Sequence, residues 1–497
     1  MTVNLVASQV VVALTAVLPL ASAVATPKDG GLLVFHLDFN TLQFRGETVS
    51  NLLEHVAANG YNAILWEIEN KVRWESCPEV VSPDAYSKDE FRKLLSQARR
   101  LGLEPIPLLQ TFGHAEYVLE CEEYAHLREC PDRKNCYCPS LPESRRFLAR
   151  FLDEYLDLFG RDVKHFHLGG DEVRGFGSCA ACKSRDPFEL YVEHLEAVST
   201  ELVRRKICPV IWHDMLRHFD KSCGTFARLP KRYAIWFWEY YTENRLSWDE
   251  TAERALRNEV ASGREIVFCP SAQCYRDDPF LVKYGMHRQN IAEAADACRR
   301  CGFPGLCLTS WSVHSGLKEL QLPLVDFAAL EFRKPDADAH WHDVVRRHFG
   351  VAPALALDDL TAWIDELGDI DGRYGRYKDA ALPPPGLIET KAANRRDVYV
   401  GLAEEVRGRT LRALNRLREV PEAERTRLLR LAIEAGELKA LYHQAQIARL
   451  KDGKPVDVPV ERTRAFYSRE QASWTVERSV RRIYDPLTGV TKHGGLP

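Results

Sequence analysis

The chain has 497 residues, of which 45% are hydrophobic and 28% are charged. This composition is that of a globular protein with a sizeable core, and it excludes a disordered or fibrous chain. The formal net charge is only −4, so the chain shows no general affinity for nucleic acid or for an anionic membrane.

The first 26 residues differ in character from the rest of the chain. They are apolar, lack charged side chains and end in small residues that form two acceptable cleavage sites, ASA and AVA. This pattern predicts a signal peptide at 1–26 and an exported protein, although no Lys or Arg precedes the apolar run. No later segment is long and apolar enough to span a bilayer.

From residue 32 onward, short apolar runs typical of buried strands alternate with amphipathic helical stretches. The eight predicted strands are 32–38, 61–67, 104–110, 163–169, 208–214, 232–238, 265–270 and 305–311. Eight buried strands joined by helices favour an α/β fold of the (β/α)8 TIM barrel type. An open doubly wound sheet is the alternative, but no glycine-rich G-x-G-x-x-G turn follows the first strand.

The last third of the chain has a different pattern. The stretch 381–386 (ALPPPG) predicts a hinge, and two apolar stripes beyond it, starting at Tyr399 and Leu428, predict helices. We therefore assign 27–345 to the catalytic barrel and 346–497 to a helical C-terminal region. This region is expected to pack on the barrel or on a partner subunit.

All fourteen cysteines lie between Cys77 and Cys307. Confinement to one domain, together with the leader-like N-terminus, predicts disulfide bonds in the long loops of an exported protein. Two C-x-x-C pairs, Cys179–Cys182 and Cys298–Cys301, leave a structural zinc site as the alternative if the chain is not exported.

The segment HFHLGGDEV at 165–173 carries the strongest chemical signal. A buried strand and two glycines bring the adjacent acids Asp171 and Glu172 to the end of the fourth predicted strand, where TIM barrels assemble their active sites. Two neighbouring carboxyl groups can take different roles when one is ionised and the other protonated. The alternative is a pair that only caps the following helix.

This segment resembles the signature of glycoside hydrolase family 20, an apolar strand running into H-x-G-(G/C)-D-E. Further motifs of the family stand at other strand ends: HLD at 36–38, LLQTFGHAEYVL at 108–119 and LTSWS at 308–312. Together they look closest to the hexosaminidase D branch. The resemblance covers residues 31 to about 320 and lacks the small domain that usually precedes the barrel.

The resemblance implies a retaining β-N-acetylhexosaminidase that uses substrate-assisted catalysis. The 2-acetamido oxygen of the sugar would attack the anomeric carbon, and Glu172 would protonate the leaving oxygen and later activate water. Asp171 would orient the acetamido group and stabilise its developing charge. His114 would tune the pKa of Glu172, backed by Glu69, although a histidine held by the core is the alternative.

We expect the sugar to be held by aromatic and acidic groups at the strand ends. The stretch CPSAQCYRDD at 269–278 resembles the family's S-P…Y-x-D stretch. The resemblance implies that Tyr275 hydrogen-bonds the acetamido oxygen, with Tyr240 as the competing donor, and that Asp277 meets a sugar hydroxyl. Trp238 and Trp311 would form the apolar wall, or else belong to the core. The remaining predicted contacts are Asp38, Glu69 and Asp214, the last of which is equally consistent with an ordinary turn.

Two positions depart from the family pattern. Asp38 is followed by Phe39 where most members carry an Arg that grips the sugar, and Val313 stands where most have a Glu. These departures bear on the exo mode of attack and on the choice between terminal β-linked GlcNAc and GalNAc. We expect an amino-sugar glycan as substrate and no cofactor or metal in catalysis. The rival hypothesis is a catalytically weak carbohydrate-binding barrel of the same fold.

Overall fold

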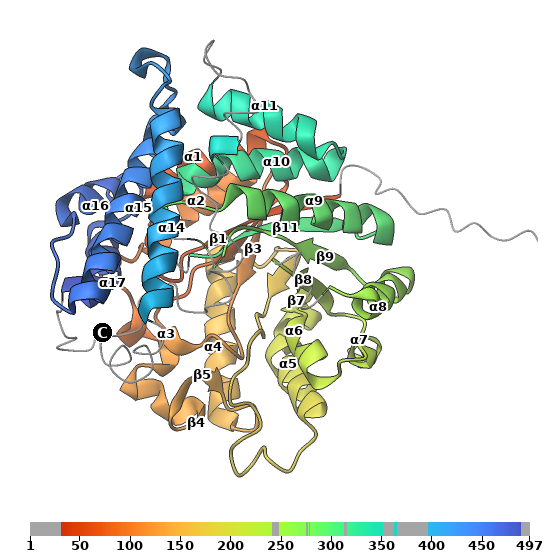
Figure 1. The fold of residues 1–497 in the computed structure, drawn as a ribbon. Coiled ribbons are helices and arrows are strands. Elements are labelled where there is room, and N and C mark those ends of the chain that lie inside the picture. Colours follow the sequence, from red (N-terminus) through yellow and green to blue (C-terminus); the bar gives the residue numbers. More distant parts are fainter. Residues whose placement is uncertain are drawn as a thin grey trace, which may run out of the picture.

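The structure is a computed structural model that describes residues 31–240, 248–274, 277, 279–312, 316–350, 362–364 and 396–488. Eight parallel strands form a closed barrel in the order β1-β2-β3-β6-β7-β8-β9-β11, and β1 pairs with β11 to complete the ring (Figure 1). The strands are β1 Leu32–Asp38, β2 Ala63–Glu67, β3 Glu104–Leu108, β6 His165–His167, β7 Cys208–Trp212, β8 Ala234–Trp238, β9 Ile266–Cys269 and β11 Gly305–Ser310. The predicted TIM barrel is confirmed.

Side chains alternate between two environments along each strand. In β1, Leu33, Phe35 and Leu37 pack outward against the helices, while Val34 packs inward with β-strand neighbours such as Leu65. This alternation follows from the two-residue period of a strand. Both faces are buried, which explains why the strands read as nearly continuous apolar runs in the sequence.

Helices surround the barrel, and they lie between the strands as the amphipathic stretches predict. Ser87 starts α2 with a capping box, in which its side chain accepts from the Glu90 amide and the Glu90 carboxylate accepts from the Ser87 amide. The barrel helices are α1 Gly46–Ala58, α2 Lys88–Arg100, α3 Glu116–Leu119, α4 Pro142–Phe159, α5 Pro187–Arg204, α6 Asp214–Phe219, α7 Gly224–Arg228, α8 Glu250–Ala261, α9 Tyr284–Cys301, α10 Leu322–Arg333 and α11 Ala337–Phe349.

Two further β elements lie outside the ring. Strands β4 (Arg128–Cys130) and β5 (Arg133–Tyr137) form an antiparallel hairpin in the long connection between β3 and β6. The short strand β10 (Ser271–Gln273) extends the sheet beside β11.

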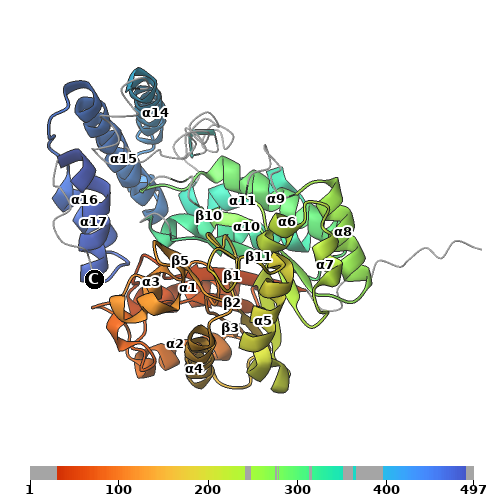
Figure 2. The same cartoon turned by 90° about the horizontal axis from the view of Figure 1, so that it is seen from below.

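The C-terminal region is helical, as predicted, and packs on the barrel. Its helices α14 (Arg396–Leu417), α15 (Arg427–Asp452), α16 (Val460–Tyr467) and α17 (Ser473–Thr488) lie together on one flank, in blue in Figures 1 and 2. The Glu470 carboxylate accepts hydrogen bonds from the backbone amides of Lys318 (2.6 Å) and Glu319 (2.8 Å), which follow β11. The Ala472 amide donates to the carbonyl of Gln43 at 2.8 Å.

Several sequence predictions fall outside the described residues, namely the leader at 1–26 and the hinge at 381–386. The division between residues 345 and 346 stays a prediction, and α11 runs across it. In the part of the chain that is described, no helix is both long and apolar enough to cross a membrane.

The predicted disulfide bonds do not form, because all fourteen cysteines are free thiols. Most of them are dispersed over different elements. Cys77 and Cys223, for example, are each buried against apolar side chains of the outer core. Where cysteines do lie together, at Cys138, Cys179 and Cys182, the sulfur atoms are 3.8 and 3.9 Å apart, well beyond the bonded distance of about 2.05 Å.

Candidate active site

The turn after β6 depends on two glycines in left-handed conformation, Gly169 (φ 67°) and Gly170 (φ 88°). A Cβ atom on Gly169 would lie 2.0 Å from the amide oxygen of Gln110, and one on Gly170 would lie 2.6 Å from the hydroxyl of Tyr191. The left-handed backbone and these close neighbours therefore favour glycine at both positions. The tight turn brings the next two residues to the carboxyl end of the barrel.

Asp171 and Glu172 face His114 from this turn. The Nε2 atom of His114 lies 3.4 Å from Oδ2 of Asp171 and 3.6 Å from Oε2 of Glu172. Asp171 is buried, whereas the Glu172 side chain is 44% exposed to solvent. The Glu172 carboxylate also pairs with the Arg174 guanidinium at 3.2 Å. The structure thus joins the three residues predicted to be catalytic.

The charges of these three groups depend on one another. Burial disfavours a charged imidazole at His114, but the Asp171 and Glu172 carboxylates outweigh it and raise its pKa to about 10. The interaction with His114, aided by Arg174, lowers the pKa of Glu172 against the effect of burial. Burial raises the pKa of Asp171 to about 6. In the free chain the proton of the pair therefore favours Asp171.

Three residues of this region, Glu69 (φ 37°), His114 (φ 50°) and Glu172 (φ 43°), have left-handed backbone although none is glycine. Each such conformation costs of order 1 kcal/mol, and it persists only where the surrounding structure enforces it. The strain thus falls on three residues that the sequence predicts for the active site. Such local strain is frequent at functional sites.

Asp214 adjoins the pair from the end of β7. Its Oδ2 accepts a hydrogen bond from the Glu172 amide at 2.8 Å, while its Oδ1 is buried without a partner among the described residues. Burial, reinforced by the charge of Asp171, raises the pKa of Asp214 to about 8. This contact places Asp214 against Glu172, and a contact between Asp214 and the sugar stays a prediction.

A buried polar layer lies directly beneath the site. Glu67, at the end of β2, accepts a hydrogen bond from the Gln110 amide at 2.8 Å and contacts Nε2 of His36 at 3.0 Å. Burial raises the pKa of Glu67 to about 7. Glu69, two residues further on, has a pKa held well above its usual range by burial and by the Glu67 charge.

Three aromatic residues predicted to hold the sugar lie together. Trp238 and Tyr240 are stacked with ring centroids 5.4 Å apart and an interplanar angle of 21°. The indole of Trp311 donates to the Tyr240 hydroxyl at 2.6 Å. The Trp238 indole N–H is buried without a partner in the described part of the chain. An apolar wall with a free polar group suits a sugar ring.

Comparison with known proteins agrees with this geometry. The sequence profile of "Glycosyl hydrolase family 20, catalytic domain" matches residues 67–299. Hexosaminidase D of Bos taurus is 31% identical over 214 residues, which are 41% of this chain and 62% of that protein. Hexosaminidase D of Homo sapiens is 29% identical over 214 residues, or 41% of this chain and 44% of that protein.

The chain is thus similar to family 20 glycosyl hydrolases over residues 67–299. Its match spans less than two thirds of the length of both hexosaminidase D relatives. Among solved structures, the β-N-acetylhexosaminidase of Bacteroides fragilis is similar with a TM-score of 0.50 and 17% identity, covering 64% of this chain and 70% of that one. This likeness supports the barrel fold.

Two of the predicted sugar contacts, Asp38 and Asp277, have structural roles. Asp38 is buried, and its two carboxylate oxygens accept from the backbone amides of Asn40 (2.6 Å) and Ser312 (2.7 Å), which joins the ends of β1 and β11. Asp277 accepts from the amides of Cys274 and Lys283, both at 2.7 Å, and pairs with His287 at 2.9 Å.

Other residues were missed or fall outside the structure. Tyr275 lies outside the described residues. Arg174, which pairs with Glu172, stands two positions after it, but a lone arginine in a loop gives no signal of its own. His36 and Gln110 could have been found, because each stands two positions after an inward-facing residue, Val34 or Leu108, and so continues the inward side of the barrel.

Proposed function

We propose that this chain is a family 20 β-N-acetylhexosaminidase that acts on an amino-sugar glycan. The observation that carries the proposal is the cluster of Asp171, Glu172 and His114 at the end of β6. The names of the relatives support the same activity. The stacked Trp238 and Tyr240 provide a flat apolar face beside which a pyranose ring can lie.

We propose further that the substrate supplies its own nucleophile. The acetamido oxygen would bond to the anomeric carbon as the glycosidic bond breaks, giving an oxazolinium ion. Asp171 suits the task of holding the acetamido N–H, because its Oδ1 is buried and has no partner among the described residues. An ionised Asp171 would also stabilise the positive charge that develops on the ring.

Glu172 would give its proton to the leaving oxygen in the first step. In the second step it would take a proton from water while the remaining hydroxide adds to the anomeric carbon, with net retention. Its partial exposure and its position beside His114 support the role of a proton carrier. His114 favours ionised Glu172 in the free chain, where the proton of the pair lies on Asp171. Binding of the sugar therefore has to move this proton from Asp171 to Glu172.

We propose that the enzyme acts in the exo mode on terminal β-linked residues and discriminates little between GlcNAc and GalNAc. The second part follows from the residues at the end of β1. Phe39 replaces the arginine that most family members place after the strand-one aspartate, and Asp38 is engaged by two backbone amides. The 3- and 4-hydroxyls would thus have few charged partners here. With so few contacts to these hydroxyls, we expect GlcNAc and GalNAc to be hydrolysed at rates within about tenfold of each other.

The experiment is an assay of the purified full chain with aryl β-N-acetylglucosaminide and β-N-acetylgalactosaminide. We expect turnover of both, which Asp171→Asn reduces strongly while the fold is retained. An aryl β-glucoside without the acetamido group should be hydrolysed very poorly. Binding of the sugars without turnover would instead favour a carbohydrate-binding barrel and contradict the proposal.

A further inference from the structure

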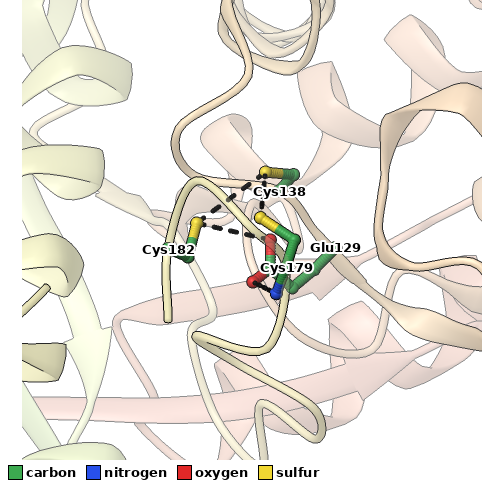
Figure 3. Close-up of side chains that lie close together, drawn as sticks. All are labelled: Glu129, Cys138, Cys179 and Cys182. Carbon is green, nitrogen blue, oxygen red and sulfur yellow. Dashed lines mark hydrogen bonds between the residues drawn. The ribbon is translucent and has the colours of Figure 1, made fainter. Parts of the chain in front are cut away.

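A cluster of three cysteines and one glutamate lies beside the active site, outside the catalytic groups. Glu129 belongs to β4, Cys138 directly follows β5, and Cys179 and Cys182 lie in the loop after the catalytic turn (Figure 3). Glu129, Cys138 and Cys182 are buried and Cys179 is partly buried. The four side chains point toward one common centre in Figure 3.

The distances within this cluster agree with tetrahedral coordination of zinc. The sulfur of Cys138 lies 3.8 Å from that of Cys179 and 3.9 Å from that of Cys182. Zn–S bonds of about 2.3 Å at the tetrahedral angle separate two sulfur atoms by about 3.8 Å. The Cys182 sulfur lies 3.5 Å from Oε2 of Glu129, against about 3.6 Å for a sulfur and an oxygen sharing a zinc ion.

The same geometry argues against a disulfide. A bond between any two of the sulfurs would require them to approach to about 2.05 Å. It would also leave the third cysteine as an odd thiol facing Glu129. Soft thiolates arranged at the corners of a tetrahedron are the ligands that zinc prefers over the hard cations calcium and magnesium.

We propose that Glu129, Cys138, Cys179 and Cys182 form a structural zinc site. Four protein ligands fill a tetrahedral shell and leave no position for substrate, so the ion would be structural. Groups around the ligands are already in place. Oε1 of Glu129 accepts from the Cys179 amide at 3.0 Å, and the Cys182 sulfur contacts the Ser140 hydroxyl at 3.1 Å. Such outer contacts orient metal ligands and tune their affinity.

The ion would join two segments that carry active-site residues. Asn135, in β5 of the hairpin, accepts from the Arg174 amide through its side chain at 2.8 Å. Its carbonyl accepts from the Ala115 amide at 3.0 Å. The hairpin therefore lies between the residue after His114 and the loop that starts at Glu172. A zinc ion bound by both the hairpin and that loop would fix the positions of His114 and Glu172 relative to each other.

The zinc content of the purified full chain tests the proposal without reference to activity. We expect about one zinc ion per chain by elemental analysis, and a loss of it in Cys179→Ser. Cys130→Ser is the matched control, because Cys130 ends β4 in the same hairpin but is not part of the cluster. This control should keep its zinc.

A second measurement protects against a variant that fails to fold. After the native chain is stripped with a chelator and supplied with Co²⁺ alone, thiolate-to-cobalt charge-transfer bands and intense tetrahedral d–d bands should appear. Glu129→Gln should keep the charge-transfer bands but bind the ion more weakly, by about 10- to 100-fold.

Two outcomes would overturn the zinc site. One is a disulfide among Cys138, Cys179 and Cys182, detected by mass spectrometry of the unreduced chain. The other is a fully reduced chain that binds neither zinc nor cobalt. The role of the zinc ion in positioning His114 and Glu172 rests on the proposed function and is tested by a separate measurement. Removal of zinc should lower both the melting temperature and the turnover of an aryl hexosaminide, while an inactive chain that still binds zinc would contradict the proposed function alone.

Discussion

Gly113 approaches the backbone of Asp171 so closely that no side chain fits between them. A Cβ atom at Gly113 would lie 2.3 Å from the Asp171 carbonyl oxygen and 3.3 Å from the Cα of Val173. Both obstacles are backbone atoms, which cannot rotate away as a flexible side chain can. The loop that carries His114 and the loop that carries the catalytic pair are therefore fitted together through a glycine.

Gly113→Ala should push these two loops apart and displace His114 from the carboxylates. We expect a loss of about 10²-fold in kcat/KM, because displacements near 1 Å at a catalytic group have effects of this size. We also expect a loss of stability of about 1–3 kcal/mol from overpacking. Steady-state kinetics and chemical unfolding measure the two effects.

Gly46→Ala is the matched control for this substitution. Gly46 begins α1, and a Cβ atom there meets nothing within 4 Å. The control should retain activity and keep or slightly raise stability, since alanine restricts the unfolded chain more than glycine does. Full activity of Gly113→Ala would show that the two loops do not need their close contact.

Glu172→Gln should distinguish a proton donor from a group that merely binds the sugar. We expect a loss of about 10²–10⁴-fold on substrates with poor leaving groups, which need protonation. Activated aryl glycosides should keep much of their rate, because their leaving group departs without a proton. Glu120→Gln, an exposed position in the same region of the chain, should behave as wild type. Equal losses on both substrate classes would contradict the role of Glu172 as acid.

The pH profile should report the shared proton of Asp171 and Glu172. The reactive form needs ionised Asp171 and protonated Glu172, so it exists only while the pair holds one proton. As pH rises through the Asp171 pKa of about 6, that proton is lost and kcat/KM should fall. As pH falls through the lowered pKa of Glu172, a second proton binds and neutralises Asp171. We therefore expect a bell with its alkaline limb near pH 6.

His114→Asn should move this bell to higher pH. The imidazolium lowers the pKa of both carboxyl groups, so its removal raises both. Asparagine tolerates the left-handed backbone found at His114. His126→Asn on the surface is the control and should leave both limbs in place. Limbs that stay fixed, or move to lower pH in His114→Asn, would contradict the charge arrangement described here.

The C-terminal helices should stabilise the barrel through Glu470. Glu470→Ala would leave the backbone amides of Lys318 and Glu319 without their acceptor. One buried and one partly buried N–H group without partners cost about 2–4 kcal/mol, which urea unfolding would reveal. Glu434→Ala removes only the ion pair with Arg469 and should cost less than about 1 kcal/mol. Similar small losses in both variants would show that this contact does not hold the region in place.

Much of the barrel could be predicted from the sequence, because its signals are local. Buried parallel strands are apolar runs, and the helices between them carry their own amphipathic pattern and caps, as at Ser87. Asp171 and Glu172 were likewise visible through the glycine turn. Some predicted strands were too long at both ends, as at 163–169, where β6 is only His165–His167.

The arrangement of groups from distant segments could not be predicted in the same way. Asp38 at the end of β1, for example, is bound by the amide of Ser312 beyond β11, at the other end of the barrel sequence. The charge of His114 depends on two carboxylates from another loop, and their pKa values depend on burial, which no local pattern records. The cysteines illustrate the same limit, since their spacing alone left disulfides and zinc both open.

The last prediction concerns the nucleophile. If the acetamido group attacks, Asp171 forms no bond to the sugar, and its free Oδ1 receives the acetamido N–H. A thiazoline mimic of the bicyclic intermediate should then bind far more tightly than substrate, because it presents the geometry and charge of the transition state. Asp171→Asn should bind this mimic much more weakly, since the amide keeps the shape but loses the charge.

Direct attack by a carboxylate is the competing mechanism, and the structure restricts its candidates. Glu67 is held by His36 and Gln110, which leaves Glu69 and Asp214 as groups with a buried oxygen that lacks a partner in the described chain. A 2-fluoro sugar lacks the acetamido group and can be trapped only by a protein nucleophile. Mass spectrometry should find no adduct under conditions where the thiazoline inhibits. A stable glycosyl ester on any carboxylate would exclude substrate assistance, and the residue that carries it would identify the nucleophile.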